Sequence, residues 1–238
     1  MHRRQVIKGL GAASASLALP ACGPGQSPAS SLPSRNQAGA PRGLHLSITG
    51  DARSNRAVTW FTDGLTPPAS VLEFDTVPPG MSAADIQTRP MTQQVSASSD
   101  PTPGVEAFTH RAIADGIDPE RPMRYRVGSD AGGWSAVQVV QPTPTEKWSF
   151  AHVGDHGITE RSQLLSQQLL NERYDLLLMA GDLSYANGDQ PIWDQWFDLN
   201  QALFANRITM TAPGNHEEED NGGATFKNRF THPQALTS

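Results

Sequence analysis

Three apolar segments in the second half of the chain each end in a glycine followed by a polar residue. The three junctions are Gly154-Asp155, Gly181-Asp182 and Gly214-Asn215. Between these segments, apolar residues recur at helical spacing over residues 160–172 and 192–204. The pattern predicts strands at 148–153, 175–180 and 208–212, joined by two helices. Because crossovers between parallel strands are right-handed, we expect one parallel sheet in an α/β fold.

The polar residues at these junctions are candidate metal ligands. In open parallel sheets, ligands bind at the carboxyl ends of the strands, so we expect Asp155, Asp182 and Asn215 on one rim. Tyr185 follows closely enough for its phenol to reach the same ion, although a buried ring with a satisfied hydroxyl is the alternative. Oxygen ligands suit hard or borderline cations. Two cations about 3.5–4 Å apart can hold a phosphoryl group and activate water, and Asp182 at the central strand is the natural bridge.

Composition and charge exclude several other classes of protein. The 238 residues carry a formal net charge of −6, which argues against a nucleic-acid binder, because such proteins present a basic surface. A single cysteine excludes a disulfide framework and a cysteine-based zinc cluster. No apolar run reaches the roughly 20 residues that a membrane-spanning helix needs.

Residues 42–144 carry the pattern of an antiparallel β-sandwich. Short runs with alternating apolar residues are separated by turn sequences such as Asp63-Gly64. We expect Trp60 and Tyr125 to supply aromatic layers of its core.

The residues before the sandwich are expected to lie outside the folded part. An Arg-Arg pair and a short apolar stretch within residues 1–22 resemble a twin-arginine export signal. The Leu-Pro-Ala-Cys-Gly sequence around Cys22 is similar to a bacterial lipobox, in which this cysteine is lipidated. Residues 23–41, rich in Pro, Gly, Ser and Ala, predict a flexible linker. We therefore expect an exported protein in the periplasm or at the cell surface, anchored to a bacterial membrane through Cys22; plain secretion is the alternative.

The motifs together resemble those of a known enzyme family. Gly154-Asp155-His156-Gly157, Gly181-Asp182-Leu183-Ser184-Tyr185 and Gly214-Asn215-His216-Glu217 are similar to the first three motifs of the calcineurin-like metallophosphoesterases. Within that group, the tyrosine of the second motif and Gly157 in place of a histidine resemble the purple acid phosphatases. Trp60 and the stretch 125–128 resemble the fibronectin type III-like domain that precedes the catalytic domain in that family. The resemblance implies a fibronectin type III-like β-sandwich at 42–144, followed by an α/β metallophosphoesterase domain over 147–238.

The resemblance also implies roles for single residues. Asp155 and Tyr185 would bind a ferric ion, and Asp182 would bridge it to a divalent Fe, Zn or Mn ion. Asn215 would bind the divalent ion. His216 would contact the phosphate ester substrate and help to protonate the leaving group. The implied reaction is hydrolysis of phosphate monoesters by attack of a metal-bound hydroxide.

Other polar residues are expected to have no part in this chemistry. His156 occupies the variable position of its motif and should point away from the first aspartate. The acidic run Glu217–Asp220 is expected to be a solvated loop, and His232 to lie at the surface. In the β-sandwich, His45 and His110 are expected to be ordinary strand residues.

The later histidine motifs of the family have no counterpart after His216. We therefore expect an incomplete α/β domain, with too few ligands for a well-held metal pair. Its last parallel strand should lack neighbours, leaving an apolar edge and face open. Two alternatives to a phosphomonoesterase stay open. One is a phosphodiesterase or nucleotidase with the same metals, and the other is a non-catalytic surface module in which only the β-sandwich folds.

Overall fold

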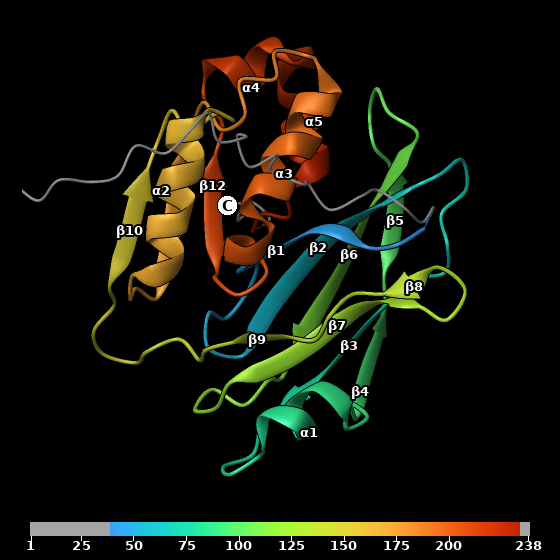
Figure 1. Cartoon of the computed structure of the whole chain (residues 1–238), viewed down its shortest axis with the longest axis vertical. Coiled ribbons are helices and arrows are strands. Elements are labelled where there is room, and N and C mark those ends of the chain that lie inside the picture. The colour runs from blue at the N-terminus through green and yellow to red at the C-terminus, as the bar shows by residue number, and fades with distance from the viewer. Residues whose placement is uncertain (1–38, 234–238) are drawn as a thin grey trace, which may run out of the picture. The chain divides into compact units, whose positions relative to one another are not determined.

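The computed structural model describes residues 39–233 of the chain (Figure 1). The predicted export signal, nearly all of the predicted linker and the candidate lipidation site Cys22 lie outside the described residues. Within the described range, no helix combines the length and the apolar character that crossing a membrane requires.

The first part of the described chain is a β-sandwich. Its elements are β1 Arg42–Ser47, β2 Asn55–Asp63, β3 Val71–Thr76, α1 Ala83–Thr88, β4 Gln93–Ser96, β5 Ser98–Pro101, β6 Ala107–Asp115, β7 Met123–Ser129, β8 Gly133–Trp134 and β9 Gln138–Val140. One antiparallel sheet has the order β1-β2-β6-β5, and the other has the order β4-β3-β7-β8 with β9 also paired to β7. Trp60 and Tyr125 are fully buried in the core between the sheets, which confirms the expected aromatic layers. The sequence pattern did not predict α1, β4 or β5, because their side chains are mostly exposed and polar.

The second part is the predicted β–α–β–α–β unit. Its elements are β10 Phe150–Val153, α2 Glu160–Asn171, β11 Leu176–Ala180, α3 Gln190–Phe204, β12 Thr209–Ala212, α4 Asn215–Glu219, the 3₁₀ turn η1 Asn221–Gly223 and α5 Ala224–Arg229. The three strands are parallel, in the order β10-β11-β12. Thr159 caps α2, because its hydroxyl accepts the N–H of Ser162. In Figure 1 the arrow of β10 points toward the end of the molecule that carries α4.

Only one face of the parallel sheet is fully covered. Leu177 and Met179 of β11 are buried against α2 and α3. On the opposite face, Leu178 is only half buried and Phe150 is 61% exposed. Although β11 is apolar on both faces, it is therefore buried on one face only, and the described residues leave an apolar face of the sheet open.

Within residues 39–233, no strand pairs with the outer edge of β10. At the other edge, β1 of the sandwich pairs in parallel with the start of β12 through Leu46 and Ile208. The backbone N–H of Ile48 also approaches the sulfur of Met210 at 3.4 Å. The sandwich thus supplies part of the neighbour that the last strand was expected to lack.

The two parts of the fold share their cores. Ala205 and Ile208, from the α/β part, belong to the core of the sandwich, and Phe61 of β2 packs among the aromatic residues of the α/β core. The buried hydroxyl of Tyr125 donates a hydrogen bond to the carbonyl of Ala205 at 2.7 Å. Because each core is completed by residues of the other part, we expect one cooperative unfolding transition.

A buried ion cluster also joins the two parts. Asp194 on α3 lies 3.0 Å from Arg229 of α5 and 3.2 Å from Arg42 of β1. The side chains of Asp194 and Arg229 are 4% and 0% exposed. Arg42 also contacts Asp63 at 2.6 Å. Buried charges are tolerated only when they are paired, so this cluster requires the two parts to be docked.

Replacing Asp194 by asparagine should destabilise the whole described fold. Arg229 and Arg42 would lose their shared buried counter-charge, and breaking such a cluster costs about 3 kcal/mol. Urea unfolding followed by tryptophan fluorescence measures the change. The control is Glu120→Gln, because its pair with Arg53 is exposed and contributes at most about 1 kcal/mol. Equal effects of the two variants would contradict the prediction.

Two buried histidines should make stability fall in acid. Burial lowers the pKa of His45 and of His110 from the ordinary 6.5 to about 4. Below about pH 6.5 the unfolded chain therefore binds protons that the folded chain does not, so stability is lost as the pH falls toward 4 and levels off below it. The slope is at most about 1.4 kcal/mol per pH unit for each histidine. Urea unfolding from pH 7.5 to 4.5 should show a shallower slope for His110→Gln; an unchanged slope would contradict the assignment.

Candidate functional site

The first two motif loops lie side by side beyond the ends of β10 and β11. The N–H of Asp155 donates to the carbonyl of Gly181 at 3.2 Å, and the N–H of His156 donates to the carbonyl of Asp182 at 3.1 Å. The N–H of Gly181 in turn donates to Ala212 at the end of β12. These bonds continue the parallel ladder past the strands, so the three motifs share one rim, as the sequence predicted.

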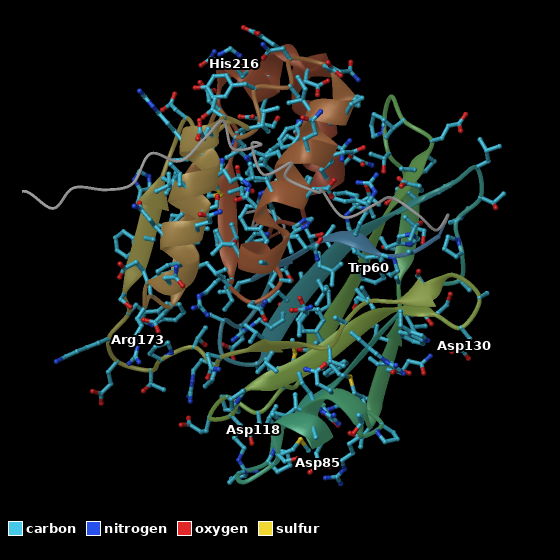
Figure 2. The ribbon with its side chains drawn as sticks, in the orientation of Figure 1. Trp60, Asp85, Asp118, Asp130, Arg173 and His216 are labelled. Carbon is cyan, nitrogen blue, oxygen red and sulfur yellow. The ribbon has the colours of Figure 1, made fainter. Side chains whose placement is uncertain are left out.

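Contacts connect four of the predicted site residues: Asp155, Asp182, Tyr185 and His216. The phenol of Tyr185 donates to Oδ1 of Asp155 at 2.9 Å, and its ring lies 4.6 Å from the ring of His216. The backbone N–H of His216 donates to Oδ1 of Asp182 at 3.2 Å, and its Nε2 lies 4.0 Å from Oδ2 of the same carboxylate. Asn215, with an exposed side chain, begins α4 beside His216. Figure 2 shows His216 at the end of the molecule where this rim lies.

The backbone of the first two loops is strained. Five non-glycine residues in the described range have a positive φ, and four of them are on these loops: Asp155 (51°), Asp182 (50°), Tyr185 (57°) and Asn187 (48°). Non-glycine residues adopt this region uncommonly, Asn and Asp more readily than Tyr, and each such residue costs about 1–3 kcal/mol. Strain of this kind clusters at functional sites, and here it coincides with the residues chosen from the sequence.

The donors at the rim fit a hard or borderline cation. Two oxygens bound to one ion at about 2.1 Å and at a right angle lie about 3 Å apart, which is the separation between Tyr185 and Asp155. Partial desolvation and the hydrogen bond to Asp155 raise the pKa of Tyr185 to about 12, so a cation must displace the phenolic proton. In residues 39–233, no three His, Cys, Asp or Glu side chains gather as a complete metal site. A cation at this rim would therefore need the phenol of Tyr185 and the amide of Asn215 as well as the two carboxylates.

Asn187 is a site residue that the sequence reasoning missed. Its Oδ1 lies 2.6 Å from Nδ1 of His216. An amide oxygen accepts from Nδ1–H, and this bond leaves Nε2 free on the side of Asp182. The sequence feature that could have identified Asn187 is its position in the loop after the second motif, two residues beyond Tyr185.

The expectation of a solvated acidic loop at Glu217–Asp220 is wrong. Residues 215–219 form α4, and the side chains of Glu217 and Asp220 are buried. Glu217 is the third residue of the helix after its N-cap Gly214, which is the spacing of a capping box. That spacing was visible in the sequence and is the signal that could have identified Glu217 as a structural residue.

Two further histidines, His156 and His232, were expected to have no part in the chemistry of the site. His156 is buried and its side chain points to α2, because its Nε2 lies 3.0 Å from the hydroxyl of Ser166. Burial lowers its pKa. His232, which was predicted to lie at the surface, is half buried: its Nε2 lies 3.0 Å from the hydroxyl of Thr211, and its ring stacks on Phe226.

Comparison with known proteins agrees with this architecture. Residues 149–236 match the family model described as calcineurin-like phosphoesterase, which places the α/β part in the metallophosphoesterase class. Residues 41–141 match the model described as purple acid phosphatase, N-terminal domain. With both domains in this order, the chain belongs to the purple acid phosphatase family.

Individual relatives show how much of such a protein the chain represents. It is 30% identical over 205 residues to human acid phosphatase type 7, covering 82% of this chain and 44% of the relative. It is 28% identical over 184 residues to purple acid phosphatase 21 of Arabidopsis thaliana, covering 75% and 38%. The solved structure of purple acid phosphatase PPD1 from yellow lupin aligns with a TM-score of 0.64 and 20% identity, covering 82% of this chain and 41% of that one. The chain thus spans less than half the length of these proteins.

Gly214→Ala should displace Asp182. A Cβ at this position would lie 2.1 Å from Oδ1 of Asp182 and 2.5 Å from its backbone nitrogen, so the loops must separate. We expect a loss of about 1–3 kcal/mol, measured by thermal unfolding, and a shift of the Asp182 amide resonance. Gly50→Ala is the control, because its Cβ would meet nothing closer than 3.4 Å. A Gly214→Ala protein with unchanged stability and an unmoved resonance would contradict the close packing.

Proposed function

We propose that the protein hydrolyses phosphate monoesters with the help of a pair of metal ions at this rim. The observation that carries the proposal is the convergence of Asp155, Asp182, Tyr185 and His216, from three separate strand ends, into direct contact. Membership of a family whose named relatives are acid phosphatases supports the choice of reaction.

The donors divide between two cations. Asp155 and Tyr185 would hold a ferric ion, Asp182 would bridge the pair, and Asn215 would bind a divalent Fe, Zn or Mn ion through its amide oxygen. Such a pair neutralises charge on the phosphoryl oxygens and makes water a better nucleophile at neutral pH.

His216 is placed to move a proton. Its Nδ1 faces the amide oxygen of Asn187, which accepts an N–H whether the ring is neutral or charged. A proton on Nε2 can therefore be donated to the phosphate or to the leaving oxygen while the ring orientation is held. The neighbouring ring of Tyr185 limits rotation of the imidazole, so orientation and proton transfer depend on the same contacts.

The cellular location is a separate proposal that rests on the sequence alone. We propose export and lipid anchoring at Cys22, so that the site faces the periplasm or the cell exterior. Mass spectrometry of the membrane fraction tests it, because an acylated Cys22 at the new N-terminus is the expected product and an unmodified cysteine is the contrary one.

Hydrolysis by the full chain supplied with Fe³⁺ and Zn²⁺ should be faster for an aryl phosphate monoester than for the matching diester. Asp182→Asn should lower the rate more than about 100-fold, since even partners outside the ligand set commonly contribute 10–100-fold. Release of p-nitrophenol from the two esters measures the ratio, with Asp118→Asn as a partly exposed control far from the motifs. A preference for the diester would favour the phosphodiesterase or nucleotidase alternative, and no hydrolysis with no bound metal would favour the non-catalytic module.

A further inference from the structure

Glu217 is a buried carboxylate that touches two of the motif loops at once. Its side chain is 1% exposed. Oε2 accepts the backbone N–H of Asp182 at 2.8 Å and of Gly214 at 2.8 Å, and Oε1 accepts the N–H of Leu183 at 2.9 Å. One side chain thus binds the loop that follows β11 and the loop that follows β12.

These bonds lie where the two loops are hardest to hold together. Asp182 has a φ of 50°, which is a costly conformation, and a Cβ on Gly181 would come within 2.9 Å of the Cα of Gly214. Hydrogen bonds from N–H groups to a charged carboxylate are roughly twice as strong as neutral ones. Three such bonds from one buried group can offset the strain and keep the loops in contact.

We propose that Glu217 is a positioning residue for the metal site. By joining residues 181–183 to residues 213–215, its carboxylate sets the separation between the predicted bridging ligand Asp182 and the predicted ligand Asn215. Glu217 acts through the backbone and not as a ligand, because both of its oxygens already accept amide N–H groups. This inference rests on the proposed function, since it concerns the same rim.

Asp220 provides a matched comparison. It lies directly after the same short helix, is also buried at 6% exposure, and accepts Nε2 of Gln190 at 3.0 Å and Nε1 of Trp193 at 3.3 Å. These partners belong to α3 and not to the motif loops. Removing the charge of Asp220 therefore removes a buried carboxylate from the same segment without touching the contacts that position Asp182.

The experiment compares Glu217→Gln, Asp220→Asn and the exposed Glu218→Gln in the metal-free full chain. The probes are Co²⁺ alone, followed by its visible d–d spectrum, and amide hydrogen exchange at Asp182 and Leu183. In Glu217→Gln the side-chain NH₂ group must face at least one of the three backbone N–H groups. The backbone amides of Asp182 and Leu183 should therefore exchange faster, and Co²⁺ should bind about 10–100-fold more weakly. Asp220→Asn should melt at a lower temperature yet keep the Co²⁺ affinity and the spectrum of the unmodified chain, and Glu218→Gln should change nothing.

The proposal is overturned if Glu217→Gln leaves Co²⁺ affinity and amide exchange unchanged, or if Asp220→Asn weakens Co²⁺ binding as much. Should Glu217→Gln fail to fold, Glu217→Asp keeps the charge but is one methylene too short to span both loops. It should then show the same selective loss of affinity, and full affinity in that variant would equally overturn the proposal. Absence of Co²⁺ binding by the unmodified chain would refute the proposed metal site, whereas the exchange measurement would still decide whether Glu217 holds the loops.

Discussion

The ring of Phe61 on β2 lies 4.8 Å from the ring of Phe197 on α3, and the rest of the structure depends on this packing between sandwich and helix. It brings apolar surface of the sandwich into the aromatic core of the α/β part, where His45 also stacks on Phe197. Burial of such large rings supplies most of the free energy that holds two layers together. Because α3 connects the second motif loop to β12, its position against the sandwich fixes where two of the three motifs begin and end.

The rim shows how backbone strain and buried charge compensate each other. Asp155, Asp182 and Tyr185 adopt left-handed conformations that an isolated loop would avoid. The ladder of N–H groups between neighbouring loops and the carboxylate of Glu217 supply bonds that such a loop lacks. The strained geometry therefore persists only while β10, β11 and β12 stay in register, so the site is a property of the sheet as a whole.

The sequence predicted the features that follow from periodic spacing of apolar residues or from residues close together in the chain. The strand-helix alternation and the shared rim of Asp155 and Asp182 follow from spacing alone, and the structure has them. It did not predict which acidic residues are buried. A run of four acids is typical of a solvated loop. The capping-box spacing marks Glu217 as the residue that reaches back to Gly214, but its burial follows from the packing of α4 onto the motif loops. The pairing of β1 with β12 was equally invisible, because it joins residues far apart in the chain.

The sandwich contacts the helix next to the site as well as packing against the parallel sheet. Gly104, in the loop between β5 and β6, lies so close to Gln190 that a Cβ there would come within 2.7 Å of its side chain. Gln190 is the first residue of α3, just beyond the loop that carries Tyr185 and Asn187, and it also contacts the buried Asp220 at 3.0 Å. A shift of the sandwich would therefore be transmitted to the start of α3 and to Asp220, which directly follows the helix that carries His216. In this architecture, the first domain supports the elements around the rim without supplying any of the predicted metal ligands.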